Sequence, residues 1–410
     1  MLARFEPPPE RLQRFLVGPL GPHIRSFADV ITQQGYRPAV GWRKIYLVAE
    51  LSRWLDRRKV PLNDLEERHI AAFLESRWRR VARRCGEATL MTLLQHLQET
   101  KLVRSPVAAP VNELGMLEQE YGRFLTRERG LMQSTVDLYQ RLVRPFVSRQ
   151  LERGRLRWNK LAAKDVIHFV LHTTPQRGGW STKSIITGLR SLLGFLFLTG
   201  RTKDNLAAAV PSVFMSCLSG MPRSLQPNQV EKVLQSCDRR TKVGKRDYAI
   251  LLLLARLGLR SGEVTRLTLD DIGWNTGELL IRGKGARLDK LPLLQDVGQA
   301  LANYLQKARP RCSSRHLFLR SRAPHVGLVG ASTLGSIVLR AMDRAHVHSP
   351  HRGPHTFRHS LATRMLTQRA SLAEIGQVLR HQNVHTTEVY AKVDLIALRQ
   401  LALPWQGGAV

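Results

Sequence analysis

The chain has 410 residues, and its 64 lysines and arginines against 32 aspartates and glutamates give a formal net charge of +32. At roughly 100–200 residues per domain, this length predicts about two to four domains, each with a core of its own. A polyanion would neutralise such a charge surplus, so nucleic acid is the leading candidate partner and an anionic membrane the second. Hydrophobic residues make up 43% and charged residues 23%, which argues against a disordered basic tail protein.

The sequence also argues against membrane insertion and secretion. No apolar run approaches the ~20 residues that a bilayer span needs, and the N-terminus lacks the basic-then-apolar order of a secretory signal. Cys85, Cys217, Cys237 and Cys312 include no C-x-x-C pair, so neither a zinc knuckle nor a disulfide framework is indicated. We therefore expect a cytoplasmic, nucleoid-associated protein without membrane contact.

Two N-terminal stretches share one pattern of elements. Residues 27–74 and 121–170 each predict a helix, a glycine break, a second helix, and a leucine-containing turn into a third helix, with Gly35 matching Gly130 at an offset of 95. The matches are mostly apolar, so chance helical periodicity explains them about as well as duplication does. We interpret them as two similar helical domains, over residues 1–105 and 111–205, joined by a proline-bounded linker.

The remainder, residues 225–410, predicts a third domain after a linker over residues 206–224. A helix begins at about Asn228, and residues 246–259 predict an apolar helix. Residues 267–294 show short β-rich runs with turn signals, which predicts a small antiparallel sheet. Ser371 and Glu374 have the spacing of a capping box, and the tail from 394 to 403 has leucines at helical spacing. The predicted fold is mainly α with one small antiparallel sheet.

Four patches in this domain carry side chains suited to chemistry. In chain order they are Leu257-Gly-Leu-Arg260-Ser-Gly-Glu263, Gly283-Lys284-Gly285, His355-Thr-Phe-Arg358-His359, and His381 followed by Thr386-Thr387-x-x-Tyr390. Together and in this order they resemble the motifs of the tyrosine recombinase (phage integrase) family. Residues 116–200 more weakly resemble the helical core-binding, SAM-like domain of that family. The first hundred residues lie outside its usual two-domain core.

The residue types alone fit cleavage of a phosphodiester. Arg260 and Arg358 can each bind phosphate oxygens in bidentate fashion, and His381 can donate a further hydrogen bond. Lys284, at a glycine-flanked hairpin tip, is suited to protonate a leaving 5′ oxygen, and His355 to accept or relay a proton. Tyr390 is the candidate nucleophile, and we expect the neighbouring cations to favour its phenolate.

The resemblance implies what these residues do. Tyr390 would attack the scissile phosphate to give a 3′-phosphotyrosyl link and a free 5′ hydroxyl, which then attacks a partner duplex. The covalent ester conserves the bond energy, so no ATP, metal or other cofactor is implied. Glu263 looks like the acidic residue that buttresses the family's site. The implied partner is double-stranded DNA, bound by a homo- or hetero-tetramer of recombinase subunits, and the implied role is integration or excision of a mobile element.

Several assignments stay open. Lys290 is an alternative to Lys284 as the acid, and His359 is interpreted as a local structural or phosphate-contacting residue. Arg380 stands where glycine is commoner in the family, and adds a cation near the presumed phosphate. The pairs His355/His359 and His381/His385 have metal-ligand spacing, but no glutamate lies between the members of either pair, so the zinc-hydrolase pattern is not met.

Two other functions remain as alternatives. A type IB topoisomerase shares the same catalytic residue types but relaxes supercoils as a monomer. A catalytically idle DNA-binding accessory protein of the same fold is the other, and the complete set of catalytic residues counts against it. The N-terminal module over residues 1–105 is expected to contact additional DNA or other subunits, because it carries basic helices.

Overall fold

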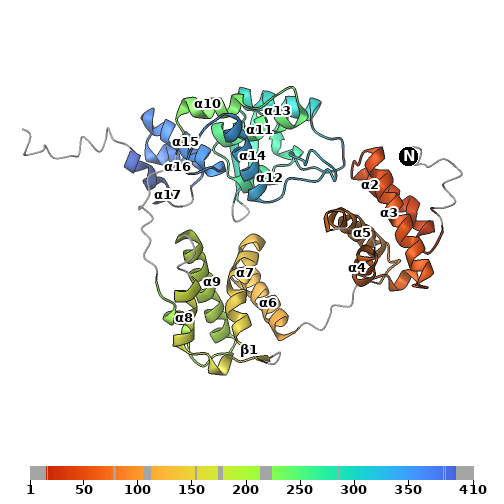
Figure 1. Ribbon diagram of the computed structural model, residues 1–410. Coiled ribbons are helices and arrows are strands. Elements are labelled where there is room, and N and C mark those ends of the chain that lie inside the picture. The colour runs from red at the N-terminus through yellow and green to blue at the C-terminus, as the bar shows by residue number, and fades with distance from the viewer. Residues whose placement is uncertain are drawn as a thin grey trace, which may run out of the picture. The chain divides into compact units, whose positions relative to one another are not determined.

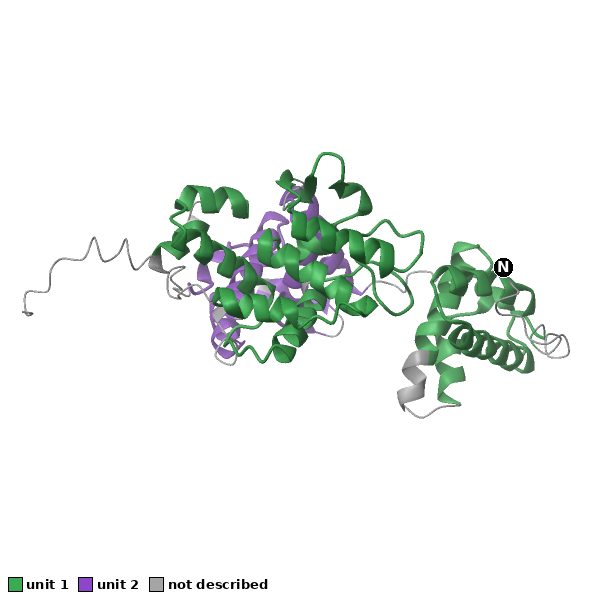
Figure 2. Cartoon of the chain, turned by 90° about the horizontal axis from the view of Figure 1, so that it is seen from above, with its two compact units in different colours: residues 1–105, 220–410 green, residues 106–219 purple. Residues whose placement is uncertain are grey.

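The structure is a computed structural model that describes residues 15, 17–76, 80–104, 112–152, 155–173, 179–212, 224–283, 287–381, 383 and 385–393 (Figure 1). The chain has two compact units, one of residues 106–219 and one of residues 1–105 together with 220–410 (Figure 2). Within the described ranges, no helix is both long and apolar enough to span a bilayer.

The N-terminal residues form a helical module with its own apolar core. In α2, Ile24, Phe27, Ala28 and Ile31 are buried at the i, i+3, i+4, i+7 spacing of one helix face. Gly35 has a φ of +79° at the break between α2 and α3, a conformation that favours glycine. The elements are η2 (Gly21–His23), α2 (Ile24–Gln33), α3 (Pro38–Arg57), η3 (Leu62–Asp64), α4 (Glu67–Glu75) and α5 (Arg80–Glu99).

Residues 106–219 form a second helical unit with a similar order of elements. Gly130, like Gly35, has a positive φ, of +60°, at the break before the second long helix. The expected shared order of elements is thereby confirmed, with the two-stranded hairpin β1–β2 added in this unit. The elements are α6 (Glu113–Arg123), η4 (Phe124–Glu128), α7 (Gln133–Arg149), β1 (Leu151–Glu152), β2 (Arg155–Leu156), η5 (Trp158–Lys160), α8 (Ala163–Thr173), α9 (Gly179–Leu198) and η6 (Leu206–Ala209).

The C-terminal part is built around α11, whose residues from Ala249 to Leu254 are all buried. The expected capping box opens α16: the Ser371 hydroxyl accepts from the Glu374 amide and donates to the Glu374 carboxylate. The helices are α10 (Pro227–Gln235), α11 (Lys242–Arg256), α12 (Ser261–Arg266), η7 (Leu269–Asp271), α13 (Gln295–Lys307), α14 (Ala331–Arg344), α15 (Pro354–Thr367), α16 (Leu372–Leu379), α17 (His385–Glu388) and η9 (Val389–Val393).

The expected small antiparallel sheet consists of β3 (Ile272–Gly273), β4 (Glu278–Arg282) and β5 (Leu288–Pro292), in the order β3-β4-β5. In β4, Leu279 and Ile281 are buried and alternate with more exposed residues, so one face of the sheet packs on the core. The mainly α fold with a small antiparallel sheet is confirmed. The expected tail helix after residue 394 lies outside the described residues.

Candidate active site

The first arginine of the site, Arg260, is fixed at the start of α12. The chain leaves α11 through Gly258, whose φ of +58° favours glycine and whose α-carbon packs closely against the Leu379 side chain. Arg260 is then the N-cap of α12, where its backbone amide donates to Glu263 Oε2 (2.9 Å) and its guanidinium donates to Glu263 Oε1 (2.8 Å). Its guanidinium also donates to the Arg380 carbonyl (3.4 Å), and the Arg260 side chain remains 37% exposed, so it is accessible to a ligand.

Arg358, on α15, is a buried cation anchored by backbone carbonyls. Its guanidinium donates to the carbonyl of Gly258 (2.5 Å) and to that of Leu379. Burial and the neighbouring charges of Arg260 and Arg380 lower the pKa of Arg358 to about 9. Its charge is therefore costly in this structure, and an anion bound beside it would relieve that cost.

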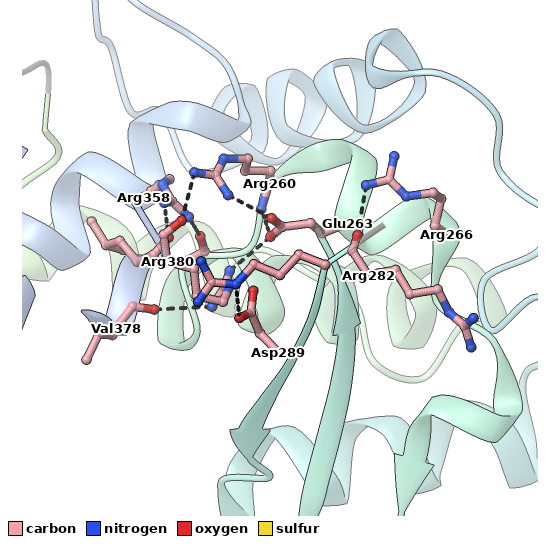
Figure 3. A network of polar contacts seen from close by, with 11 residues as sticks. Arg260, Glu263, Arg266, Arg282, Asp289, Arg358, Val378 and Arg380 are labelled. Carbon is pink, nitrogen blue, oxygen red and sulfur yellow. Dashed lines mark hydrogen bonds and ion pairs between the residues drawn. The ribbon is translucent and has the colours of Figure 1, made fainter. Parts of the chain in front are cut away.

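Arg380 follows α16 with a φ of +56°, the left-handed region in which glycine is favoured. A left-handed backbone at this position is consistent with glycine being commoner there in the family that the sequence resembles. Its side chain does not extend outward: the guanidinium donates to Glu263 Oε2 (2.9 Å) and to the Val378 carbonyl (3.1 Å). Figure 3 shows Glu263 between Arg260 and Arg380, with Arg358 alongside.

Tyr390, in η9, is only 2% exposed and packs with Ala362, Ile375 and Leu379. Its hydroxyl lies 2.9 Å from Nδ1 of His359, one helical turn after His355 on α15. Burial raises the pKa of Tyr390, and the opposing charges of Arg358 and Arg260 do not outweigh it. The neighbouring cations act on the phenol in the expected direction, but desolvation is the larger effect and the pKa is raised overall.

His381 stacks almost parallel to the Tyr390 ring, with 6.5 Å between ring centroids and 4° between planes. Its Nδ1 lies 2.7 Å from the Thr387 hydroxyl. Burial lowers the pKa of His381 to about 4, and the positive charges of Arg358 and Arg260 act in the same direction. A neutral ring that accepts from Thr387 at Nδ1 carries its proton on Nε2, where it can be donated.

The remaining predicted residues are the candidates for proton transfer: His355, Lys284 and the alternative Lys290. His355 lies at the start of α15, and its pKa is lowered by desolvation of the ring and by the charges of Arg358 and Arg260. Lys284 lies outside the described residues, in the connection between β4 and β5. The alternative acid Lys290 pairs with Glu278 across the sheet (2.9 Å).

The structure thus brings Arg260, Glu263, Arg358, His381 and Tyr390 together. It also adds three residues that sequence reasoning did not place in these roles: His359 at the hydroxyl, Thr387 at His381, and Arg380 at Glu263. The signal for His359 was its position one turn after His355. Nothing in the sequence pointed to a contact between Thr387 and His381; Thr387 was noted only for its place in the motif before Tyr390.

A cleft of about 540 Å³ lies between β5 and α16, and Arg380 and His381 are among its lining residues, as are Lys290 of β5 and Arg287 directly before it. In the part of the chain that the structure describes, no three His, Cys, Asp or Glu side chains are grouped so as to hold a metal.

The comparisons with known proteins agree with this geometry. Residues 223–395 match the Phage integrase family. The chain is 42% identical to the "Putative integrase/recombinase y4rA" of Sinorhizobium fredii, over 96% of both chains. It is 30% identical to the tyrosine recombinase XerD of Listeria monocytogenes, over 70% of this chain and 96% of that protein.

Among solved structures, the XerH site-specific recombinase bound to palindromic difH substrate superposes with a TM-score of 0.56 at 18% identity, covering 74% of this chain and 98% of that one. At this identity the likeness concerns the fold alone.

The fold is that of the tyrosine recombinases, and a cluster of guanidinium groups lies beside a tyrosine, Tyr390, in this chain. The chain belongs to the phage integrase, or tyrosine recombinase, family, and is a site-specific recombinase of that class.

Proposed function

We propose that the protein cuts and rejoins duplex DNA through a 3′-phosphotyrosyl intermediate at Tyr390, without metal or ATP, in the integration or excision of a mobile element. The observation that carries this proposal is an excess of positive charge beside the nucleophile. The guanidinium groups of Arg260 and Arg380 share one carboxylate, that of Glu263, and Arg358 is close enough for the charges of all three to affect its pKa. A phosphodiester, whose non-bridging oxygens accept paired hydrogen bonds from arginine, fits that excess.

In the cleavage step, the Tyr390 oxygen forms a bond to phosphorus while its proton passes to Nδ1 of His359. The bond from phosphorus to the 5′ oxygen breaks, and the 3′ phosphate stays on the tyrosine. Because burial raises the pKa of Tyr390, the phenol is protonated before attack, and a base in contact with its hydroxyl is required. His359 must then be neutral, with its ring proton on Nε2.

Arg260, Arg358 and the Nε2 proton of His381 stabilise the negative charge that grows on the phosphate oxygens in the transition state. Lys284 supplies the proton that the leaving 5′ oxygen takes up. Rejoining is the reverse reaction with a new 5′ hydroxyl: it attacks phosphorus, the bond to Tyr390 breaks, and the phenol recovers its proton. Each step exchanges one phosphate ester for another, so the bond count is unchanged.

We further propose that the expected domains form a clamp on DNA. We assign residues 1–105 to the additional helical module, 111–205 to the core-binding domain, 206–224 to a linker and 225–410 to the catalytic domain. The helical modules and the catalytic domain grip the duplex together, in a tetramer of recombinase subunits in the cytoplasm. Deleting residues 1–109 tests the role of the first module, because an unchanged DNA footprint and unchanged assembly would contradict it.

Strand exchange tests the function directly. Two differently labelled duplexes that carry DNA from around the protein's own gene are incubated with the full chain in EDTA. Recombinant products that join the two labels are expected. Relaxation of a supercoiled plasmid with no joined product would instead indicate a topoisomerase. Tight, salt-sensitive binding with neither reaction would indicate an accessory DNA-binding protein.

A further inference from the structure

Arg380 occupies a backbone conformation that disfavours its own side chain. Its φ of +56° ends α16, and in this region the Cβ of any residue other than glycine crowds the neighbouring carbonyl. Such a conformation persists only where contacts with the rest of the protein stabilise it, and in Arg380 the side chain makes these contacts.

Those contacts are buried and face Glu263. The Arg380 side chain is 5% exposed and the Glu263 side chain 2% exposed, and their ion pair is 2.9 Å long. The Nε atom of Arg380 is buried and has no hydrogen-bond partner among the described residues. By contrast, Arg260 binds the other oxygen of the same carboxylate and keeps 37% of its side chain exposed. Of the two arginines, Arg260 is therefore the one able to reach DNA.

The geometry points to Arg380 as a positioning residue for DNA cleavage: it fixes the Glu263 carboxylate, which in turn holds the Arg260 guanidinium toward the scissile phosphate, and it makes no phosphate contact itself. This inference rests on the proposed function. It replaces the expectation that Arg380 adds a cation at the phosphate. Arg380 caps the C-terminus of α16 directly before His381, and Glu263 lies in α12 directly after its N-cap Arg260, so the pair also links the segments that carry His381 and Arg260.

Charge balance supports the same assignment. Burial alone would raise the pKa of Glu263, but the hydrogen bond from the Arg260 amide and the charge of Arg380 outweigh it, and the pKa is lowered. Glu263 is thus held as a carboxylate that accepts from both arginines. Without the Arg380 side chain, the Glu263 carboxylate loses one of its two charge-assisted hydrogen bonds from guanidinium groups. The carboxylate is then less firmly fixed, and so is the Arg260 guanidinium that donates to it.

The test uses Arg380→Gly and Arg380→Lys in the full chain. Glycine suits the left-handed backbone and removes the ion pair, whereas lysine keeps a cation for Glu263. Arg369→Gly is the matched control, since Arg369 also has a positive φ, of +66°, but is exposed at the end of α15. The substrate is a nicked duplex that carries the cleavage site, so that covalent adduct accumulates.

At saturating DNA, we expect Arg380→Gly to form adduct on the order of 10- to 100-fold more slowly than the wild type, as misplacement of a reacting group predicts. We expect Arg380→Lys to recover most of that loss and Arg369→Gly to match the wild type. The affinity of Arg380→Gly for the duplex should stay within about 2-fold, with the same salt dependence. If the slope of log binding constant against log salt concentration fell by about the value of one phosphate contact, Arg380 would itself contact DNA, and the proposal would be overturned.

Amide hydrogen exchange provides a second readout that needs no DNA. Arg380→Gly should speed exchange at the Arg260 amide, which donates to Glu263, by on the order of 10-fold, and Arg369→Gly should not. Unchanged exchange, or a wild-type cleavage rate in Arg380→Gly, would show that Arg380 does not position Glu263. A wild-type protein that forms no adduct would contradict the proposed function, and the exchange measurement would still decide the role of Arg380.

Discussion

The hydroxyl oxygen of Tyr390 lies 2.9 Å from Nδ1 of His359, although the two residues are 31 positions apart in the chain and belong to η9 and α15. The phenol is buried and its pKa is raised, so it does not ionise in advance of the reaction. A hydrogen-bonded imidazole is the group that can remove its proton as the bond to phosphorus forms.

Replacing His359 should therefore slow cleavage while DNA binding is retained. We expect His359→Gln to reduce the rate of adduct formation by about 10²–10⁴-fold, the usual range for loss of a general base. Raising the pH should restore part of the rate, because bulk hydroxide can then take the phenol proton. Single-turnover adduct formation measures the effect, with His348→Gln as the control at an exposed histidine. A wild-type rate in His359→Gln would remove His359 from the mechanism.

The Thr387 hydroxyl should determine which nitrogen of His381 carries the proton. We expect Thr387→Val to lower the cleavage rate by roughly 10-fold, because the ring loses the hydrogen bond that orients it and sets its tautomer. Thr386→Val provides a matched control at the adjacent exposed threonine. The account would be contradicted if both variants cleaved equally fast.

His381 should also make the folded protein less stable in acid. Its pKa in the folded protein is about 4, against an ordinary value of 6.5, so on acidification the unfolded chain takes up this proton first. The stabilisation is fully present above pH 6.5 and is lost as the pH falls from 6.5 to 4. We expect the free energy of unfolding to fall less steeply in His381→Asn than in the wild type across this window. Urea titrations at several pH values measure the two slopes, and parallel slopes would contradict the assignment.

Much of this site could be predicted from sequence because its residues lie in short local motifs. Arg260 with Glu263 forms an i,i+3 pair at a helix start, and Arg358, His381 and Tyr390 follow in the order that the resemblance requires. The capping box at Ser371 and the small sheet were also predictable, since both depend on neighbours close in the chain.

The roles of Arg380 and His359 could not be predicted in this way. Arg380 binds a carboxylate 117 positions away, and His359 meets a hydroxyl 31 positions away, so both contacts exist only in the folded chain. The direction of the Tyr390 pKa shift depends on how deeply the ring is buried, and the sequence shows only the neighbouring cations. Lys284 remains a prediction, since it lies outside the described residues.

The most direct test of the central claim is to capture the covalent intermediate. The purified protein is mixed with DNA from around its own gene in EDTA, the reaction is quenched with detergent, and the protein-linked fragments are sequenced. The linked residue is identified by peptide mapping, with Tyr390→Phe beside the wild type. The account predicts adducts at defined 3′ ends, linked to Tyr390, with the wild type only. Adducts that persist in Tyr390→Phe, or that require an added divalent metal, would contradict it.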